Sequence, residues 1–172
     1  MGNNIILIGF KASGKTTLGR ILAKRLSKYF IDTDSIIEEI YLGKNGEKAT
    51  CREIYRRQGK EYFREIEKEA IGKITNSKNS IISIGGGALD DPENRDNIAL
   101  MGQIVYLKED PDILYNRIEW QDIPFFGKDK RGSFEKLFKE RSRIYSDAAD
   151  VEIDQKGRSV EVIADEIITK VK

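Results

Sequence analysis

Short apolar runs alternate along the chain with longer segments in which apolar and polar positions are mixed. The runs are rich in β-branched residues and span residues 5–8, 29–31, 81–84, 104–107 and 151–153. Short runs of this composition, separated by helical patterns, are typical of strands in a mostly parallel sheet. The pattern therefore predicts an α/β fold.

The segments between the runs carry helix signals. After the first run, apolar residues follow one face of a 3.6-residue period at Leu18, Ile21, Leu22 and Leu26. Asp110 before Pro111 predicts a helix cap and a first turn. The C-terminal segment keeps a longer apolar face, at Val160, Ile163, Ala164, Ile167, Ile168 and Val171. We expect this last helix to pack on the sheet.

Residues 120–133 differ from the segments around them. They are mostly polar, contain glycine and Pro124, and lie between two helical patterns. The segment predicts a loop, for which there are two interpretations: an ordinary surface connection, or a mobile cover over a phosphate site.

Composition narrows the class of protein. The 172 residues are enough for one domain, 1–172, with a sizeable core. Lys and Arg number 30 against 29 Asp and Glu, mixed along the chain, which argues against a nucleic-acid partner. No apolar stretch approaches the roughly 18 residues of a membrane span. We expect a cytoplasmic enzyme.

Two residue counts restrict the chemistry. The single cysteine, Cys51, leaves no internal disulfide and no cysteine metal cluster, and we expect it to pack. The absence of histidine excludes an imidazole base, a histidine nucleophile and a His-ligated metal. Proton transfer would therefore fall to a carboxylate, a lysine or a water.

The segment from Gly9 to Thr17, GFKASGKTT, carries the strongest chemical signal. It fits G-x-x-x-x-G-K-[ST] directly after the first apolar run and before a helical pattern. In such a loop the backbone wraps a phosphate chain, the lysine reaches the β- and γ-phosphates, and the Ser/Thr hydroxyl ligates Mg²⁺. We predict ATP or GTP binding by Ala12, Ser13, Gly14, Lys15, Thr16 and Thr17.

Asp32 and Asp34 follow the second predicted strand, at the sheet edge where open α/β sheets bind their ligands. On an extended segment their side chains would point the same way. One carboxylate could then take a water of the Mg²⁺ shell or a proton from an attacking hydroxyl, while the other binds the acceptor. Alternatively, both carboxylates cap the next helix.

Two further motifs are ambiguous when each is taken alone. Gly85, Gly86 and Gly87 follow the third predicted strand and could let a substrate lie against bare backbone, or form a plain turn. Arg64 lies one helical turn before Glu67, which could hold the guanidinium for a carboxylate ligand or form an ordinary surface ion pair.

Taken together, these motifs resemble the shikimate kinase family over nearly the whole chain. The resemblance rests on 9–17, Asp32-Thr-Asp34, Gly59-x-x-x-Phe63-Arg64-x-x-Glu67, Gly85-Gly-Gly-Ala88 and Arg141-x-x-x-Tyr145, in order and spacing. It implies a nucleoside-monophosphate-kinase-like P-loop fold: three α/β/α layers around a five-stranded parallel sheet, with a substrate-binding region at about 32–62 and a lid at about 118–132.

The resemblance also implies a reaction. The γ-phosphoryl group of ATP would pass to the 3-hydroxyl of shikimate with Mg²⁺ as cofactor, in a monomer whose partners are these two small molecules. Asp34 would hold ring hydroxyls, while Arg64 and Arg141 would hold the carboxylate. Asp32 would be the base or an outer-shell Mg²⁺ ligand.

Other positions carried over from the family concern the backbone and the nucleotide. Gly86, with Gly85 and Gly87 beside it, would contact shikimate. Arg117 and Arg158 would lie on either side of the adenine.

One departure from the family lies in the lid, where an arginine normally precedes a proline. Here the pair is Ile123-Pro124. An arginine that acts on the transition state is worth on the order of 10³-fold or more in rate, so another cation should replace it. Lys11, inside the phosphate loop, is our first candidate for a catalytic cation, unless it points to solvent. The lid cations Lys128, Lys130 and Arg131 are the second.

The departure keeps two alternatives open. One is a kinase of the same fold that acts on another polyhydroxy acid such as gluconate. The other is a nucleotide-binding module without catalysis, against which the intact Lys15, Thr16, Asp32 and Asp34 argue.

Overall fold

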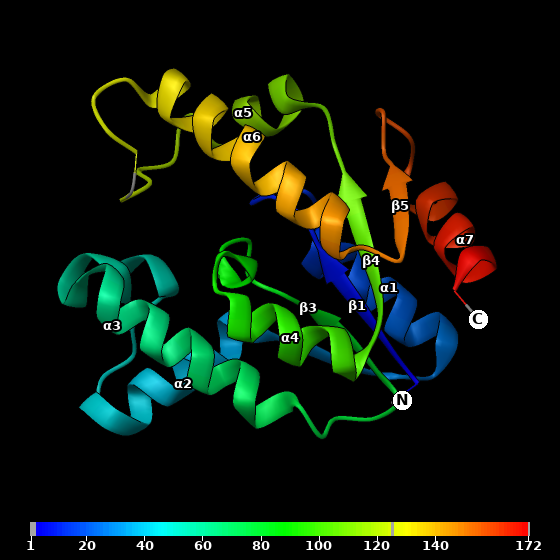
Figure 1. Ribbon diagram of the computed structural model, residues 1–172, viewed down its shortest axis with the longest axis horizontal. Coiled ribbons are helices and arrows are strands. Elements are labelled where there is room, and N and C mark those ends of the chain that lie inside the picture. The colour runs from blue at the N-terminus through cyan, green and yellow to red at the C-terminus, as the bar shows by residue number, and fades with distance from the viewer. Residues whose placement is uncertain (1–2, 125, 172) are drawn as a thin grey trace.

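The computed structural model describes residues 3–124 and 126–171 of the chain. Strands and helices alternate along it (Figure 1). In chain order the elements are β1 (Asn4–Ile8), α1 (Lys15–Leu26), β2 (Tyr29–Asp32), α2 (Thr33–Asn45), α3 (Cys51–Ile74), β3 (Ser80–Ser83), the 3-10 turn η1 (Ala88–Asp90), α4 (Pro92–Met101), β4 (Gly102–Lys108), α5 (Pro111–Ile118), α6 (Lys130–Ala148), β5 (Val151–Asp154) and α7 (Val160–Lys170).

The strands form one five-stranded sheet in the order β2-β3-β1-β4-β5. Every pairing is parallel, and in the centre Ile6 of β1 is in register with Ile82 of β3 and Ile104 of β4. Each predicted apolar run became a strand, so the predicted α/β class with a parallel sheet is confirmed.

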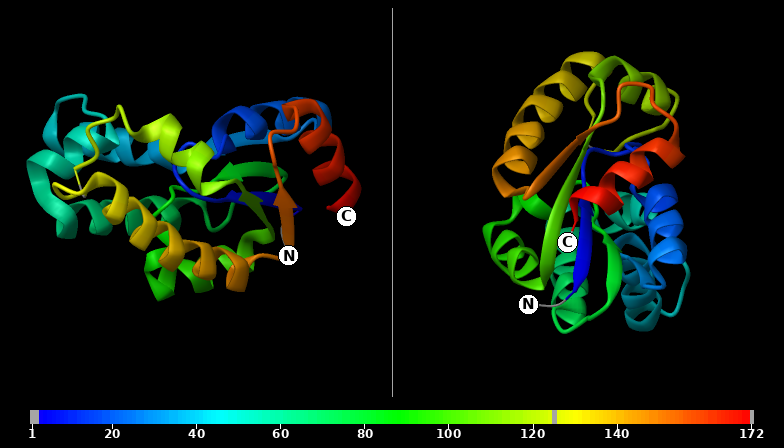
Figure 2. Two further views of the ribbon diagram at one scale, coloured as in Figure 1. Left: turned by 90° about the horizontal axis from the view of Figure 1, so that it is seen from above. Right: turned by 90° about the vertical axis from the view of Figure 1, so that its right-hand side faces the viewer.

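Helices cover both faces of the sheet, because successive side chains of a buried strand point to opposite faces. Ile6 and Ile8 join a core formed with α3, α4, α5 and α6, whereas Ile5 and Leu7 join a second core formed with α1 and α7. The right panel of Figure 2 shows these layers, with α4 and α6 on one side of the sheet and α1 and α7 on the other. The predicted packing of the C-terminal helix is confirmed through Ile163, Ala164 and Ile167.

A third, smaller core lies between α2 and α3. Ile37, Ile40 and Tyr41 of α2 pack there with Ile54 and Ile66 of α3. Helix α3 begins with a capping box in which Thr50 and Glu53 satisfy each other's backbone N–H groups. This local core lies between α2 and α3, mostly within the segment that the family resemblance assigns to substrate binding.

Helix α3 is kinked at Gly59. Its φ of 85° and ψ of 177° lie in a region that is essentially restricted to glycine. The kink sets the first half of the helix at an angle to the second half, which carries Arg64 and Glu67. The glycine of the Gly59-x-x-x-Phe63-Arg64 motif thus has a backbone role.

The predicted loop 120–133 is shorter than expected at its C-terminal end. Helix α6 begins at Lys130, because the Asp129 side chain accepts a hydrogen bond from the backbone N–H of Gly132 and caps the first turn. Residues 130–133 are therefore helical, and the prediction of a loop there was wrong. At the other helix start in question, Asp110 caps α5 as predicted.

In the part of the chain that the structure describes, no helix combines the length and the apolar character that crossing a membrane requires.

Two glycines of α3 test the origin of the kink. Replacing Gly59 with Ala should lower the free energy of unfolding by about 1–3 kcal/mol, because alanine is strained at this φ and ψ. Replacing Gly72 with Ala, at an open helical position, should instead raise it by about 0.5–1 kcal/mol. Urea unfolding of both variants measures the two changes in the free energy of unfolding. If both variants were stabilised, or both destabilised, the assignment of the kink to Gly59 would be contradicted.

Candidate active site

The phosphate loop joins the end of β1 to the start of α1. Gly9, Ala12 and Gly14 all have positive φ, so the chain between the two elements is tightly curled. The Lys15 ammonium lies inside the curl and donates hydrogen bonds to the carbonyl oxygens of Gly9 and Phe10, each at 2.9 Å. The loop thus has the shape and the central cation that phosphate binding requires.

Two side chains from distant elements brace this loop from outside. Gln155, after β5, donates to the carbonyl oxygen of Ser13 at 3.0 Å. Arg117, at the end of α5, donates to that of Ala12 at 3.0 Å and pairs with the buried Glu109 at 3.2 Å. Sequence reasoning missed Gln155 and Glu109, and neither belongs to a motif that could have indicated it.

Asp32 caps the following helix, and its carboxylate also contacts the phosphate loop. One carboxylate oxygen caps α2 by accepting from the backbone N–H of Asp34 at 3.1 Å. The other accepts from the Thr16 hydroxyl at 2.9 Å. The helix cap and the link to the phosphate loop therefore use different oxygens of the same group.

Asp34 lies in the first turn of α2, not on an extended segment. The expectation that Asp32 and Asp34 project together from a strand was wrong, because the cap at Asp32 starts the helix at Thr33. Both carboxylates nevertheless lie close enough to Lys15 to raise its pKa. Asp34 thus lies near Lys15, as does Asp32, although Asp34 belongs to a helix and not to an extended segment.

The three glycines after β3 pass close to the functional side chains. The Thr33 hydroxyl accepts from the backbone N–H of Gly85 at 2.9 Å, and Tyr145 donates to the carbonyl oxygen of Gly86. A methyl group on Gly85 would lie 2.8 Å from an oxygen of Asp34. One on Gly87 would lie 2.7 Å or less from nitrogens of both Arg64 and Arg141. A side chain at either position would therefore displace groups of the site.

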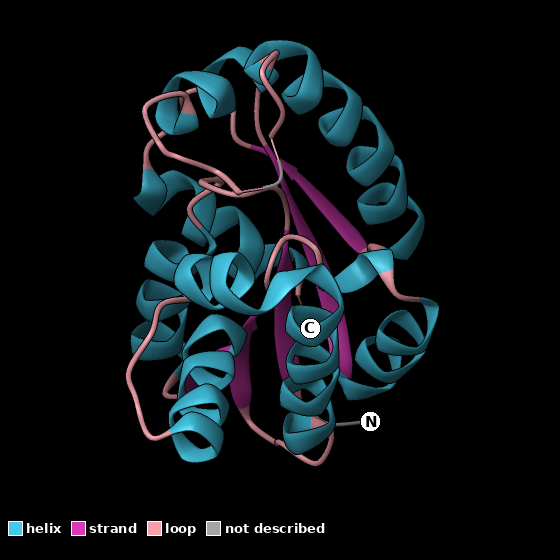
Figure 3. Ribbon diagram, turned by 90° about the vertical axis from the view of Figure 1, so that its left-hand side faces the viewer, coloured by secondary structure: helices cyan, strands magenta, loops and turns pink. Residues whose placement is uncertain are grey.

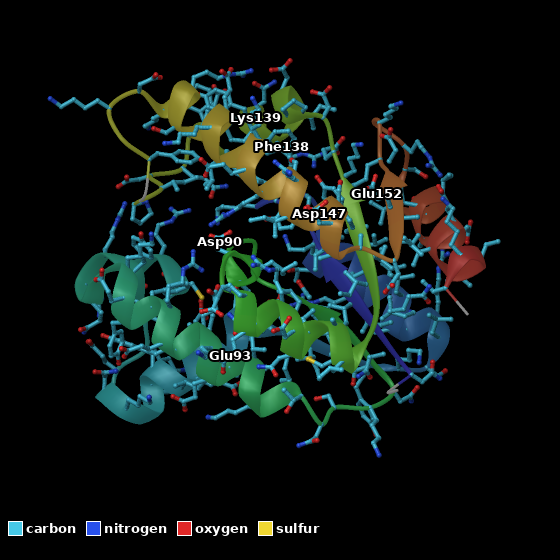
Figure 4. All side chains as sticks on the ribbon, viewed as in Figure 1. Asp90, Glu93, Phe138, Lys139, Asp147 and Glu152 are labelled. Atoms are coloured by element: carbon cyan, nitrogen blue, oxygen red, sulfur yellow. The ribbon has the colours of Figure 1, made fainter. Side chains whose placement is uncertain are left out.

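The two arginines meet at a carboxylate that sequence reasoning missed. Arg64 pairs with the buried Glu67 as predicted, and also donates to Asp90 at 3.2 Å. Arg141 donates to both oxygens of Asp90, at 3.1 and 2.7 Å. In Figure 4, Asp90 lies at the end of its turn between α3 and α6. Its only sequence signal was its position three residues after Gly87.

Most of the predicted site residues line one cavity of about 780 Å³. Its lining comes from the segments that follow the strands and from α3 and α6. Figure 3 shows the molecule from the side on which α2 and α3 lie. The predicted residues that line the cavity are Lys11, Ala12, Gly14, Lys15, Thr16, Thr17, Asp32, Asp34, Arg64, Gly85, Gly86, Gly87 and Arg141.

Three predicted residues lie outside the lining of this cavity. Ser13 is part of the phosphate loop but is fully buried. Arg117 contacts the loop from outside, and Arg158 pairs with Glu166 at 2.5 Å. The placement of the two arginines around an adenine stays a prediction.

The described part of the loop between α5 and α6 covers the cavity. Ile123, where the family resemblance leads one to expect arginine, is buried at 5% exposure in the core that contains Phe134. Arg52 of α3 donates to Gln121 at 2.8 Å, and Arg56 pairs with Asp122. Apolar packing and two polar contacts thus hold the loop against α3.

The cations of this loop do not line the cavity. Arg131 pairs with Asp112 and Glu135, each at 2.6 Å, and lies over the Tyr115 ring. Lys128 and Lys130 are likewise outside the lining. Besides Lys15 and the two arginines already described, the cations that line it are Lys11, Arg52, Lys60 and Lys136.

Burial and neighbouring charges shift the pKa values of several site residues. Burial lowers the pKa of Lys15 to about 8, against the opposing charges of Asp34 and Asp32. Although water reaches Asp34 through the cavity, the surrounding protein desolvates it, and this together with Asp32 raises its pKa. Burial also raises the pKa of Glu67, which Arg64 opposes.

Cys51 lines the same cavity, and its thiol lies 3.4 Å from the carbonyl oxygen of Asp34. Burial and the nearby carboxylates raise the pKa of this thiol. A thiol that stays protonated is a poor nucleophile, so a packing role agrees with this environment.

Comparison with known proteins identifies relatives over almost the whole length. A family model described as "Shikimate kinase" matches residues 11–172. The curated shikimate kinase of Persephonella marina is 34% identical over 169 residues, which cover 98% of this chain and 99% of that protein.

Solved structures agree with the sequence comparison. The structure of shikimate kinase from Acinetobacter baumannii in complex with shikimate matches with a TM-score of 0.86 at 29% identity, covering 98% of this chain and 95% of that one. Shikimate kinase from Aquifex aeolicus matches with a TM-score of 0.79 at 29% identity, covering 96% and 94%.

The lowered pKa of Lys15 predicts a pH dependence for nucleotide capture. The protonated ammonium attracts phosphate, so kcat/KM for ATP should fall as the pH rises through about 8. The value of kcat should fall less, because bound phosphates stabilise the charged lysine. Initial rates between about pH 6.5 and 9.5 measure both profiles.

Replacement of Lys15 by Arg provides the control. A guanidinium stays charged throughout this range, so any residual activity of the variant should lack the decline above pH 8. A flat kcat/KM profile in the unmodified protein would contradict the assignment.

Proposed function

The chain belongs to the shikimate kinase family, and on that premise we propose how its residues phosphorylate the 3-hydroxyl of shikimate with ATP. The observation that carries the proposal is one cavity that is lined both by a phosphate loop and by a pair of arginines. Phosphoryl transfer depends mainly on positioning and charge stabilisation, and this cavity offers both.

The phosphate loop binds the nucleotide. Backbone N–H groups at the start of α1 and the Lys15 ammonium hold the β- and γ-phosphates, in exchange for the carbonyl contacts that Lys15 makes at Gly9 and Phe10. Arg117 and Arg158 flank the adenine. The contact of Arg117 with the carbonyl oxygen of Ala12 supports its place beside the nucleotide.

Mg²⁺ fits the oxygen atoms beside the loop. The Thr16 hydroxyl and the Asp32 carboxylate adjoin each other at 2.9 Å, and Mg²⁺ prefers oxygen ligands. Within residues 3–124 and 126–171, no group of three or more carboxylate or cysteine side chains could hold a metal by itself. Thr16 would hold the ion directly and Asp32 through water, together with the nucleotide, and the ion would offset phosphate charge.

The part of the cavity around Arg64 and Arg141 binds the acceptor. Arg64 and Arg141 hold the carboxylate of shikimate, and the backbone at Gly86 contacts its ring. Asp34 accepts hydrogen bonds from ring hydroxyls and thereby aims the 3-hydroxyl at the phosphate loop. The absence of a side chain at Gly85 leaves room for this carboxylate.

Asp34 also accepts the proton from the attacking hydroxyl. The family resemblance implies this role, or that of an outer-shell Mg²⁺ ligand, for Asp32. Because Asp32 already caps α2 and contacts Thr16 of the phosphate loop, we propose it for the Mg²⁺ role. The raised pKa of Asp34 makes its carboxylate the better proton acceptor.

Lys11 supplies the cation that Ile123 cannot. It lines the cavity, and it lies close enough to Lys15 and Asp34 to lower the pKa of both. The lid cations Lys128, Lys130 and Arg131 do not reach the cavity, which favours Lys11 over them. A second cation at the γ-phosphate would stabilise the charge that develops during transfer.

The arrangement of the elements suggests the working parts of the enzyme. Residues 32–62, built around α2 and the first half of α3, act as the acceptor-binding region, and residues 118–132 act as the lid. We further propose that the enzyme works in the cytoplasm as a monomer, with no nucleic-acid or membrane partner.

The test of the function is coupled ADP release with MgATP and shikimate, compared with gluconate and with no acceptor. Saturable release that depends on shikimate is expected. Release with gluconate alone would indicate a different acceptor, and binding of ATP with no release would indicate a nucleotide-binding module.

The role of Lys11 predicts a specific loss. Replacing Lys11 with Ala should lower kcat by roughly 10²- to 10³-fold, as removal of one transition-state donor does, with a much smaller change in KM for shikimate. Lys128→Ala, which removes a lid cation outside the cavity, should leave kcat within about twofold. Equal rates for both variants would show that Lys11 points away from the reaction.

A further inference from the structure

Asp90 occupies the arginine pair in the manner of a bound carboxylate. Its two oxygens accept from Nε and Nη2 of Arg141 at 3.1 and 2.7 Å, and one of them also accepts from Nη2 of Arg64 at 3.2 Å. A carboxylate facing the side of a guanidinium through two parallel hydrogen bonds is the geometry by which arginine recognises carboxylate ligands.

The two partners differ in their freedom to move. The Arg141 side chain is 8% exposed, whereas that of Asp90 is 35% exposed and ends a single 3-10 turn that lines the cavity. Asp90 is therefore the partner that has room to turn toward water, whereas Arg141 is enclosed by the surrounding protein.

The local charge balance makes a ligand carboxylate compete with Asp90. Arg64 and Arg141 already face Glu67 and Asp90, so these four groups are balanced two against two. A third carboxylate would exceed the two guanidinium charges in a partly desolvated place, where like charges repel strongly. Of the two protein carboxylates, Asp90 is the one that can leave, because Glu67 is buried.

We propose that Asp90 is an internal competitor for the acceptor's carboxylate, and that its displacement sets the affinity and selectivity of the acceptor site. The inference rests on the proposed function, since it takes shikimate as the ligand of Arg64 and Arg141. It makes Asp90 a specificity-determining residue that weakens carboxylate binding and holds the arginine pair in place until the acceptor arrives.

The experiment compares the unmodified protein with Asp90→Asn and Asp90→Ala. Calorimetric titration measures the binding of shikimate and of its carboxamide, which keeps the ring hydroxyls and lacks the negative charge. Asp165→Asn is the matched control, since it removes a carboxylate paired with Arg25 at 2.7 Å far from the cavity. Coupled ADP release is recorded for every protein.

If Asp90 competes, both variants should bind shikimate roughly five- to tenfold more tightly, as expected when a charged hydrogen-bond partner is lost. They should bind the carboxamide no more tightly than the unmodified protein does. Shikimate should also raise the melting temperature of the variants more than that of the unmodified protein, because it supplies the carboxylate that Arg141 has lost. Asp165→Asn should show none of these changes.

Weaker or unchanged shikimate binding in both variants would overturn the inference, and would show instead that Asp90 only positions the arginines. In that case ADP release by the unmodified protein would still support the proposed function. If the unmodified protein neither bound shikimate nor released ADP with it, both the proposed function and the inference would fail.

Discussion

The parallel pairing of β1 with β3 on one side and β4 on the other determines where the functional segments of this molecule lie. Because neighbouring strands run the same way, the segments that follow β1, β2 and β3 all leave the sheet at one edge. These segments are the phosphate loop, the Asp32–Asp34 turn and the three glycines. The contacts between them, of Thr16 with Asp32 and of Thr33 with Gly85, follow from that shared edge.

Charge is distributed unevenly over the cavity that forms there. Near the phosphate loop, Lys15 and Lys11 face Asp32 and Asp34, and partial desolvation shifts the pKa of Lys15 down and that of Asp34 up. The raised pKa of Asp34 suits a proton acceptor, whereas the lowered pKa of Lys15 confines its full positive charge to pH values below about 8. Elsewhere in the cavity, Arg64 and Arg141 are paired with Glu67 and Asp90, so a carboxylate ligand would have to compete with carboxylates of the protein itself.

The proposed acceptor-binding region, residues 32–62, and the proposed lid, residues 118–132, are held by local contacts outside the sheet. The acceptor-binding region depends on its own small core and on the backbone conformation of Gly59. The lid depends on the packing of Ile123 and on contacts with Arg52 and Arg56. An apolar residue at position 123 gives the lid a packed anchor. In the proposed function the reacting cation is instead Lys11 of the phosphate loop, which follows directly after β1.

By itself, the sequence determined the strands, the main helices and the phosphate loop, because these depend on local periodicity and on motifs of fixed spacing. It also placed Asp32, Asp34, Arg64 and Arg141 at one site, through order and spacing along the chain. Only the tertiary structure decided that Asp34 reaches the site from a helix, that Arg131 turns away from it, and that Asp90 joins the two arginines. These outcomes depend on contacts between residues 26 and 51 positions apart, or on competition among nearby partners, and neither leaves a periodic signal in the sequence.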